Sequence, residues 1–120
     1  MTEAKLVIFG SRDFDDYELL ERWVDTIRNT YSLKVVELVS GTARGADKLG
    51  ELWAATHVVP ITPFPAEWGK YGKSAGYRRN AEMAEYATHA IGFWDGKSKG
   101  TKHMIDLCHR ADIPTWVVSF

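Results

Sequence analysis

The sequence predicts an α/β fold built on a mostly parallel five-stranded sheet, with helices on both faces. Short apolar runs rich in β-branched residues alternate with segments whose apolar residues recur every three or four positions. This alternation is typical of parallel strands joined by helical crossovers. Polar, glycine-bearing loops follow several of the apolar runs, as expected where a buried strand reaches the surface. The length of 120 residues suits a single domain spanning residues 1–120.

The chain begins with a strand and a helix. Leu6–Phe9 is a continuous apolar run that ends at Gly10, which is typical of a buried parallel strand. Either Asp13 or Asp15 is expected to cap the helix that follows. The apolar face of this helix has the spacing expected of an amphipathic helix. Its residues are Leu20, Val24, Ile27 and Tyr31.

The middle of the chain continues the alternation and then departs from it. Lys34–Val39 is the second predicted strand, Arg44–His57 the second helix, and Val58–Ile61 a short third strand. Pro60 suits the edge or the end of a strand. Thr62–Ala75 has neither helical nor strand periodicity and is rich in proline, glycine and aromatic residues. A loop of this length in a small domain is usually functional or disordered, and its aromatic residues argue against disorder.

The last part of the chain predicts two more helix–strand pairs. The fourth strand is His89–Trp94 and the fifth is Ile113–Val118, with the polar loop Asp95–Gly100 after the fourth. Thr101 is expected to cap the helix between them. The helix before the fourth strand has the weak face Tyr77, Ala81, Ala84 and Thr88, and the last helix has the face Met104, Leu107, Cys108 and Ala111.

Right-handed crossovers make a Rossmann-like strand order, 3-2-1-4-5, the leading choice. In such a sheet, ligands bind beyond the carboxyl ends of the strands, near the switch between strands 1 and 4. The polar loops after strands 1, 2 and 4 fall at this edge, and the long loop after strand 3 starts from it. The sequence therefore predicts a ligand cleft at this edge.

Four motifs in this order resemble the SLOG superfamily, and more closely its YspA-like branch of small single-domain proteins from bacteria and phages. The motifs are Gly10-Ser11-Arg12, Ser40-Gly41-x-Ala43-Arg44-Gly45-Ala46-Asp47, Gly76-x-Arg78-x-Asn80 and Trp94-Asp95-Gly96-x-Ser98-x-Gly100-Thr101. The resemblance implies a Rossmann-like fold and a nucleotide or a nucleotide derivative, such as a nucleotide sugar or an ADP-ribose-like molecule, as ligand. Relatives in the superfamily include the cytokinin-activating phosphoribohydrolases, the DNA-processing protein DprA and sensor domains of antiviral systems.

The phosphoribohydrolases allow a sharper comparison. Their motif Pro-Gly-Gly-x-Gly-Thr is followed at once by catalytic glutamates. Here Gly100-Thr101 matches the end of that motif, but Lys102, His103 and Met104 follow it. The resemblance therefore implies phosphate binding more strongly than hydrolysis.

The predicted ligand-binding residues surround the glycine loops. Helix N-termini there would offer unpaired amides to a phosphate. These residues are Gly10, Ser11, Arg12, Gly41, Ala43, Arg44, Gly45, Ala46, Asp47, Arg78, Asn80, Asp95, Ser98, Gly100 and Thr101. Adjacent helical residues point about 100° apart. We expect Arg78 to face the cleft, with Arg79 as the alternative.

Several side chains fit two roles. Asp47 could accept from ribose hydroxyls or stabilise the start of its helix. Asp95 could act on a ligand or form the turn that an Asp-Gly pair favours. Trp68 and Tyr71 could stack on a nucleobase or pack their loop onto the core.

The leading prediction is a nucleotide-binding sensor or ligand-processing protein. If the protein is an enzyme, the expected reaction is cleavage of the N-glycosidic bond of a nucleoside monophosphate, with Glu67, Asp95 and Asp47 as candidate carboxyls. Binding of single-stranded DNA, as in DprA, is a third possibility. The net charge of −1 disfavours it.

Composition restricts the other classes of function. Cys108 is the single cysteine, so no internal disulfide forms, which suits a cytoplasmic protein. The histidines and this cysteine lack metal-ligand spacing, so we expect no metal and no other cofactor. No apolar run approaches the roughly 18 residues of a membrane span, so no membrane contact is expected. A homodimer is left open.

Overall fold

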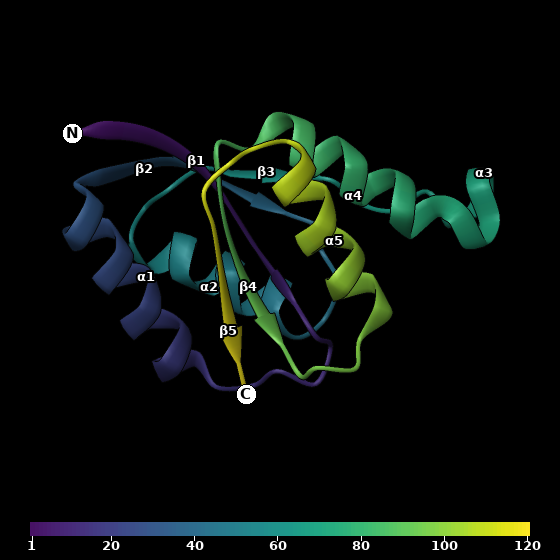
Figure 1. The fold of residues 1–120 in the computed structure, drawn as a ribbon, viewed down its shortest axis with the longest axis horizontal. Coiled ribbons are helices and arrows are strands. Elements are labelled where there is room, and N and C mark those ends of the chain that lie inside the picture. The colour runs from purple at the N-terminus through teal and green to yellow at the C-terminus, as the bar shows by residue number, and fades with distance from the viewer.

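The computed structural model describes all 120 residues and contains one five-stranded sheet in which every strand pair is parallel. The strand order is β3-β2-β1-β4-β5, which confirms the predicted Rossmann-like arrangement (Figure 1). The strands are β1 (Thr2–Gly10), β2 (Leu33–Ser40), β3 (Ile61–Pro63), β4 (His89–Trp94) and β5 (Thr115–Ser119).

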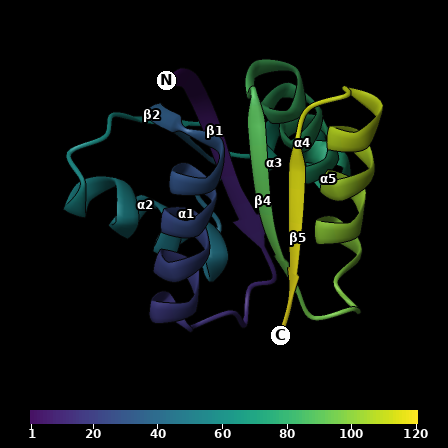
Figure 2. The same ribbon diagram turned by 60° about the vertical axis from the view of Figure 1, so that its left-hand side comes forward.

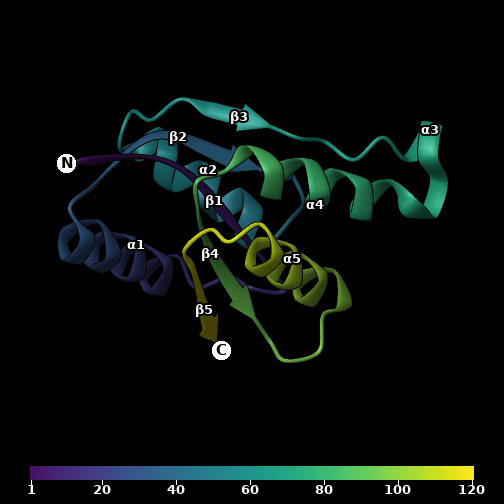
Figure 3. The same ribbon diagram turned by 45° about the horizontal axis from the view of Figure 1, so that its top comes forward.

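Helices cover both faces of the sheet (Figure 2). On one face lie α1 (Tyr17–Tyr31) and α2 (Ala46–Thr56), and on the other lie α4 (Ala75–Tyr86) and α5 (Lys99–Arg110). A short helix, α3 (Trp68–Tyr71), and a 3₁₀ turn (Gly72–Ser74) precede α4 and lie beyond its first turn, away from the sheet (Figures 1 and 3).

The central strand β1 explains why the first apolar run is continuous. Leu6 and Ile8 belong to the core on the α1/α2 side, whereas Val7 and Phe9 belong to the core on the α4/α5 side. Successive side chains of a strand point to opposite faces, so a strand covered on both faces needs apolar residues at every position.

Both predicted helix caps were wrong by a few residues. Asp16, not Asp13 or Asp15, caps α1 and accepts from the Leu19 amide at 3.1 Å. The connection before the helix is longer than expected because Phe14 is buried and stacks on Phe93, with ring centroids 4.5 Å apart.

The cap of α5 is Ser98 rather than Thr101. Ser98 has an extended backbone, and its side chain accepts from the Thr101 amide at 3.3 Å. Thr101 lies inside the first turn and is buried. The helix starts earlier than predicted because an upstream turn already presents Ser98 in the capping conformation.

The third strand also lies later than predicted, at Ile61–Pro63 rather than Val58–Ile61. Val58 adopts a left-handed conformation with φ of 56°, which extended structure excludes. Thr62–Ala75 was expected to lack regular structure but contains the end of β3, α3 and the 3₁₀ turn. Helices of three or four residues are too short to produce a periodic pattern. None of the helices combines the length and apolar character that a membrane span requires.

Candidate functional site

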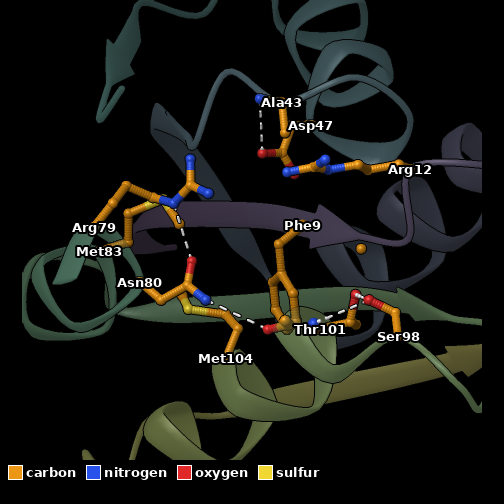
Figure 4. Close-up of a pocket in the computed structure, with 12 residues that line it drawn as sticks. Phe9, Arg12, Ala43, Asp47, Arg79, Asn80, Met83, Ser98, Thr101 and Met104 are labelled. Atoms are coloured by element: carbon orange, nitrogen blue, oxygen red, sulfur yellow. Dashed lines mark hydrogen bonds between the residues drawn. The ribbon is translucent and has the colours of Figure 1, made fainter. Parts of the chain in front are cut away.

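A cleft lies at the carboxyl end of the sheet, where the chain leaves β1 in one direction and β4 in the other. Four segments wall it: the end of β1 and the residues after it, the β2–α2 loop, the inner face of α4, and the start of α5 (Figure 4). This central hollow has a volume of about 90 Å³. Its lining consists of Phe9, Gly10, Arg12, Ala43, Asp47, Arg79, Asn80, Met83, Ser98, Gly100, Thr101 and Met104.

Two larger hollows adjoin the central one. A hollow of about 410 Å³ lies between residues 41–44 and residues 65–68, and one of about 220 Å³ lies between the start of α4 and Gly100. Arg12 and Arg79 line all three hollows, and Trp68 lines the two larger ones. Together the hollows are in the size range of small-molecule sites, roughly 300–1,000 Å³.

Asp47 presents a buried carboxyl to the cleft from the first turn of α2. Only 5% of the residue is exposed, and its Oδ2 accepts from the Ala43 amide at 3.2 Å. Burial raises the pKa of Asp47 to about 6, although the Ala43 hydrogen bond and the Arg79 charge oppose the rise. Figure 4 shows the Arg12 side chain reaching toward this carboxyl. Asp47 therefore titrates in the range where proton transfer at near-neutral pH is practical.

Gly45 and Ala46, which precede Asp47, pack the β2–α2 loop against the β1–α1 loop. Gly45 has a φ of 83°, and a Cβ there would lie 2.4 Å from the Ser11 carbonyl oxygen. The Ala46 amide donates to the same oxygen at 3.4 Å, and Ala46 is fully buried. Neither residue lines the hollows, so the structure places both in the contact between the β1–α1 and β2–α2 loops.

Arg79 and Asn80 connect two walls of the cleft from the first turns of α4. Arg79 Nη1 donates to the Gly41 carbonyl, and its Nε donates to Asn80 Oδ1 at 3.0 Å. Asn80 Nδ2 donates to the Gly100 carbonyl at 3.3 Å. Burial of the guanidinium, and then the like charge of Arg12, lowers the pKa of Arg79.

Arg78 faces elsewhere. Its Nε donates to Ser74 Oγ at 3.1 Å, and its guanidinium lies 4.4 Å from the centre of the Tyr71 ring. It lines a fourth hollow, which contains Glu67 and is also reached by Arg79 but by none of the cleft's other polar residues. The geometry therefore favours Arg79 as the cleft arginine, although the expected ligand role of Arg78 is still a prediction.

The sequence shows that Arg79 shares a helix face with an apolar residue, although it does not say whether that face meets the cleft. Met83 follows Arg79 by four residues, and residues four apart share a helix face. Met83 is 1% exposed and lines the cleft with Arg79.

The start of α5 offers hydrogen-bond donors to the cleft. Ser98 Oγ accepts from the Thr101 amide and, at 2.9 Å, from the Thr101 hydroxyl. The amides of Lys99 and Gly100 hydrogen-bond no protein acceptor, as expected for the first residues of a helix. Ser98, Gly100 and Thr101 all line the central hollow, which places the positive end of the helix dipole there.

Ser11 and Asp95 join the loop after β1 to the loop after β4. Ser11 is 1% exposed, and its Oγ accepts from the Asp95 amide at 3.2 Å. Asp95 Oδ1 accepts from the amides of Lys97 and Ser98, both at 2.8 Å, and these bonds lower the pKa of Asp95. Neither residue lines the three hollows.

The remaining predicted residues fall around the cleft as follows. Gly10 and Ala43 line the central hollow, and Gly41 and Arg44 line the one of about 410 Å³. Among the three candidate catalytic carboxyls, Asp47 alone lines the cleft, because Asp95 forms a turn and Glu67 is exposed in the fourth hollow. No group of three or more His, Cys, Asp or Glu is placed to hold a metal ion.

Comparison with known proteins gives two matches. The model of the family described as "YspA, cpYpsA-related SLOG family" matches residues 4–71, from β1 to the end of α3. The Gene 61 protein of Mycobacterium phage D29 is 35% identical over 124 residues, which cover 97% of this chain and 95% of the phage protein. No solved structure matches.

Proposed function

Because the chain belongs to the YspA, cpYpsA-related SLOG family, we propose that it binds a nucleotide or nucleotide-derived ligand in the cleft at the carboxyl ends of the strands. Family membership is compatible with a ligand of this class. The observation that carries the proposal is that the start of α5, with its unpaired Gly100 amide, lines the same hollow as the side chains of Arg12 and Arg79. Such donors match the geometry and the charge of a phosphate.

The two glycine-bearing loops, at the starts of α2 and α5, are not equivalent as phosphate sites. In the β2–α2 loop, the Ala43 amide already donates to the protein's own carboxyl, Asp47. An ionised carboxylate there repels a phosphate, whereas it accepts well from a ribose hydroxyl. We therefore place the phosphate at the start of α5, and the sugar against Asp47.

The protein acts as a sensor or as a ligand-processing module. One observation favours the second role, namely a buried cleft carboxyl whose pKa lies near 6. In an N-glycosidase acting on a nucleoside monophosphate, Asp47 would hold the ribose and assist proton transfer. Chromatographic detection of free base from adenosine monophosphate, lost in Asp47→Asn, would support this alternative. A wild-type protein that releases no base from any nucleoside monophosphate would exclude it.

Isothermal titration against adenine and guanine nucleotides, cyclic nucleotides and ADP-ribose tests the proposal. Arg79→Gln is expected to lower the affinity about tenfold or more, because hydrogen bonds to charged groups contribute roughly 1.5–3 kcal/mol. Arg78→Gln is the matched control and should stay within about twofold. Thermal unfolding of both variants separates lost binding from lost folding. No binding across the panel, or equal losses in the two variants, would contradict the proposal.

A further inference from the structure

We propose that the ligand is a nucleoside diphosphate or an ester of one, with the diphosphate lying along the α5 start and the Arg12–Arg79 pair and the base stacked on Trp68. The inference rests on the proposed nucleotide binding and names the class of nucleotide and a residue that selects it.

The excess of positive charge around the three hollows favours a ligand with more than one phosphate. Arg12, Arg44, Lys73 and Arg79 line them, against a single carboxyl, Asp47. None of the four basic residues forms an ion pair, since the salt bridges of the chain lie elsewhere. The chain as a whole has a net charge of −1, so this excess of positive charge is local. A polyanion compensates the repulsion between these like charges.

The anion-binding groups are also spread along a path. The unpaired Gly100 amide lies at one end, where Gly100 lines the central hollow and the adjoining hollow of about 220 Å³. Arg12 and Arg79 lie between this hollow and the two larger ones, because they line all three. A molecule that reaches from the α5 start to the larger hollows therefore passes the two guanidiniums. Such a molecule binds most tightly if it carries one phosphate at the start of α5 and a second phosphate at the two arginines.

Trp68 lies at the end of this path and has a free ring. It lines both larger hollows, is 52% exposed, belongs to neither hydrophobic core and pairs with no other ring or cation. The ring passes close to Gly76, where an added Cβ would lie 3.3 Å from Trp68 Cη2. The other aromatic side chains nearby are already paired, Tyr71 with Arg78 and Tyr77 with His103. Trp68 is thus the ring available for stacking on a base.

Isothermal titration of the wild-type protein with ADP, ADP-ribose, AMP and inorganic pyrophosphate tests the inference. ADP and ADP-ribose are expected to bind about tenfold or more tightly than AMP. Trp68→Ala should weaken ADP about tenfold, a loss typical of one stacked base, and should leave pyrophosphate within about twofold. Trp68→Phe should restore most of the ADP affinity, because it keeps an aromatic face.

Trp23→Ala is the matched control, since Trp23 is 38% exposed on α1 and lines none of the three hollows. It should leave every affinity unchanged. Equal affinities for AMP and ADP, or an equal loss of ADP and pyrophosphate binding in Trp68→Ala, would overturn the inference while nucleotide binding stands. Tighter binding of a single-stranded oligonucleotide than of ADP would also overturn it. Failure of all the nucleotides to bind would instead refute the proposed function.

Discussion

Asp47 shows how one residue serves both the fold and the cleft. It lies in the first turn of α2, where a carboxylate stabilises the helix dipole, and it accepts from the Ala43 amide of the loop before it. Burial still raises its pKa from 3.8 to about 6, so removal from water outweighs these favourable contacts. The folded protein thus keeps a carboxyl that is easier to protonate than the same group in the unfolded chain.

Asp47 therefore makes the stability depend on pH in a predictable direction. Between about pH 4 and 6 the folded state holds a proton that the unfolded state has released, so this group favours folding at low pH and loses that contribution as the pH rises. Asp47→Asn removes the effect. We expect the stability of Asp47→Asn relative to wild type to increase by about 2 kcal/mol between pH 4.5 and 7.5.

Urea unfolding of both proteins at several pH values measures this difference. Titrating groups that do not interact with Asp47, among them Asp95 with its lowered pKa, contribute equally to both proteins and cancel in the comparison. Parallel stability profiles would show that the Asp47 pKa is not raised by folding.

Two glycines with nearly the same positive φ differ in the space around them. Gly45 has a φ of 83° and Gly96 a φ of 82°, but an added Cβ meets the Ser11 carbonyl oxygen at 2.4 Å in the first case and nothing within 4 Å in the second. Gly96→Ala is expected to lower the free energy of unfolding by about 1 kcal/mol, because alanine is strained at a positive φ. Gly45→Ala should lower the free energy of unfolding by about 3 kcal/mol or more, because the two loops must separate and because the Gly45 backbone, with ψ of −130°, is strained for any residue but glycine. Chemical denaturation measures both, and equal losses would argue against close packing of these loops.

At the scale of elements, α4 and α5 shape the cleft more than the strands do. The first turns of α4 supply Arg79 and Asn80, which hold the Gly41 carbonyl on one side and the Gly100 carbonyl on the other. The start of α5 supplies the unpaired amides. A change at either helix start is therefore expected to alter binding without disturbing the sheet.

Gly100→Ala tests this separation of binding from stability. Nothing lies within 4 Å of the added methyl group, and alanine favours a helix over glycine by up to about 1 kcal/mol. The variant should be as stable as wild type or slightly more stable, yet should bind nucleotides several-fold more weakly because the methyl group narrows the central hollow. Gly69→Ala in α3 is the control, since it too has open space and lines none of the hollows. Calorimetric titration and thermal unfolding provide the two readouts, and unchanged affinity would mean that the ligand does not reach the α5 start.

At the scale of the whole molecule, the strand order gathers charges that are distant in sequence. Arg12, Arg44 and Arg79 follow or face three different strands and meet at one edge of the sheet, on a chain whose net charge is −1. The attraction for an anion is thus confined to the cleft instead of extending over a basic surface. This favours a small ligand over a nucleic-acid strand.

Salt dependence tests this electrostatic picture. Salt shortens the Debye length from about 10 Å at 0.1 M to about 3 Å at 1 M. Raising sodium chloride from 0.05 to 0.5 M is expected to weaken ADP binding several-fold, since exposed Arg12 and Arg44 contribute to attraction. Adenosine, which carries no phosphate, should bind weakly and equally at both salt concentrations. An identical salt response for the two molecules would contradict a cleft that recognises phosphate by charge.

The elements that could be predicted are those with strong local patterns. The continuous apolar run of β1 and the limits of β4, His89–Trp94, follow from burial on both faces, and the alternation of strands and helices follows from periodicity. The position of β3 and the cap of α1 could not be predicted, because they depend on a left-handed residue, Val58, and on the buried Phe14. Such features arise from contacts with distant parts of the chain.

The amino-acid sequence by itself determined the fold and its strand order, because hydrophobic periodicity and crossover handedness are properties of the chain. It thereby also determined which loops meet at the cleft, at the switch between β1 and β4. Only the tertiary structure decided what each side chain does there. It turned Arg79 rather than Arg78 into the cleft, placed Asp95 in a turn and buried Asp47. The rotation of a helix about its axis and the solvation of a carboxyl depend on the packing of the other elements. These are long-range properties that no short stretch of sequence specifies.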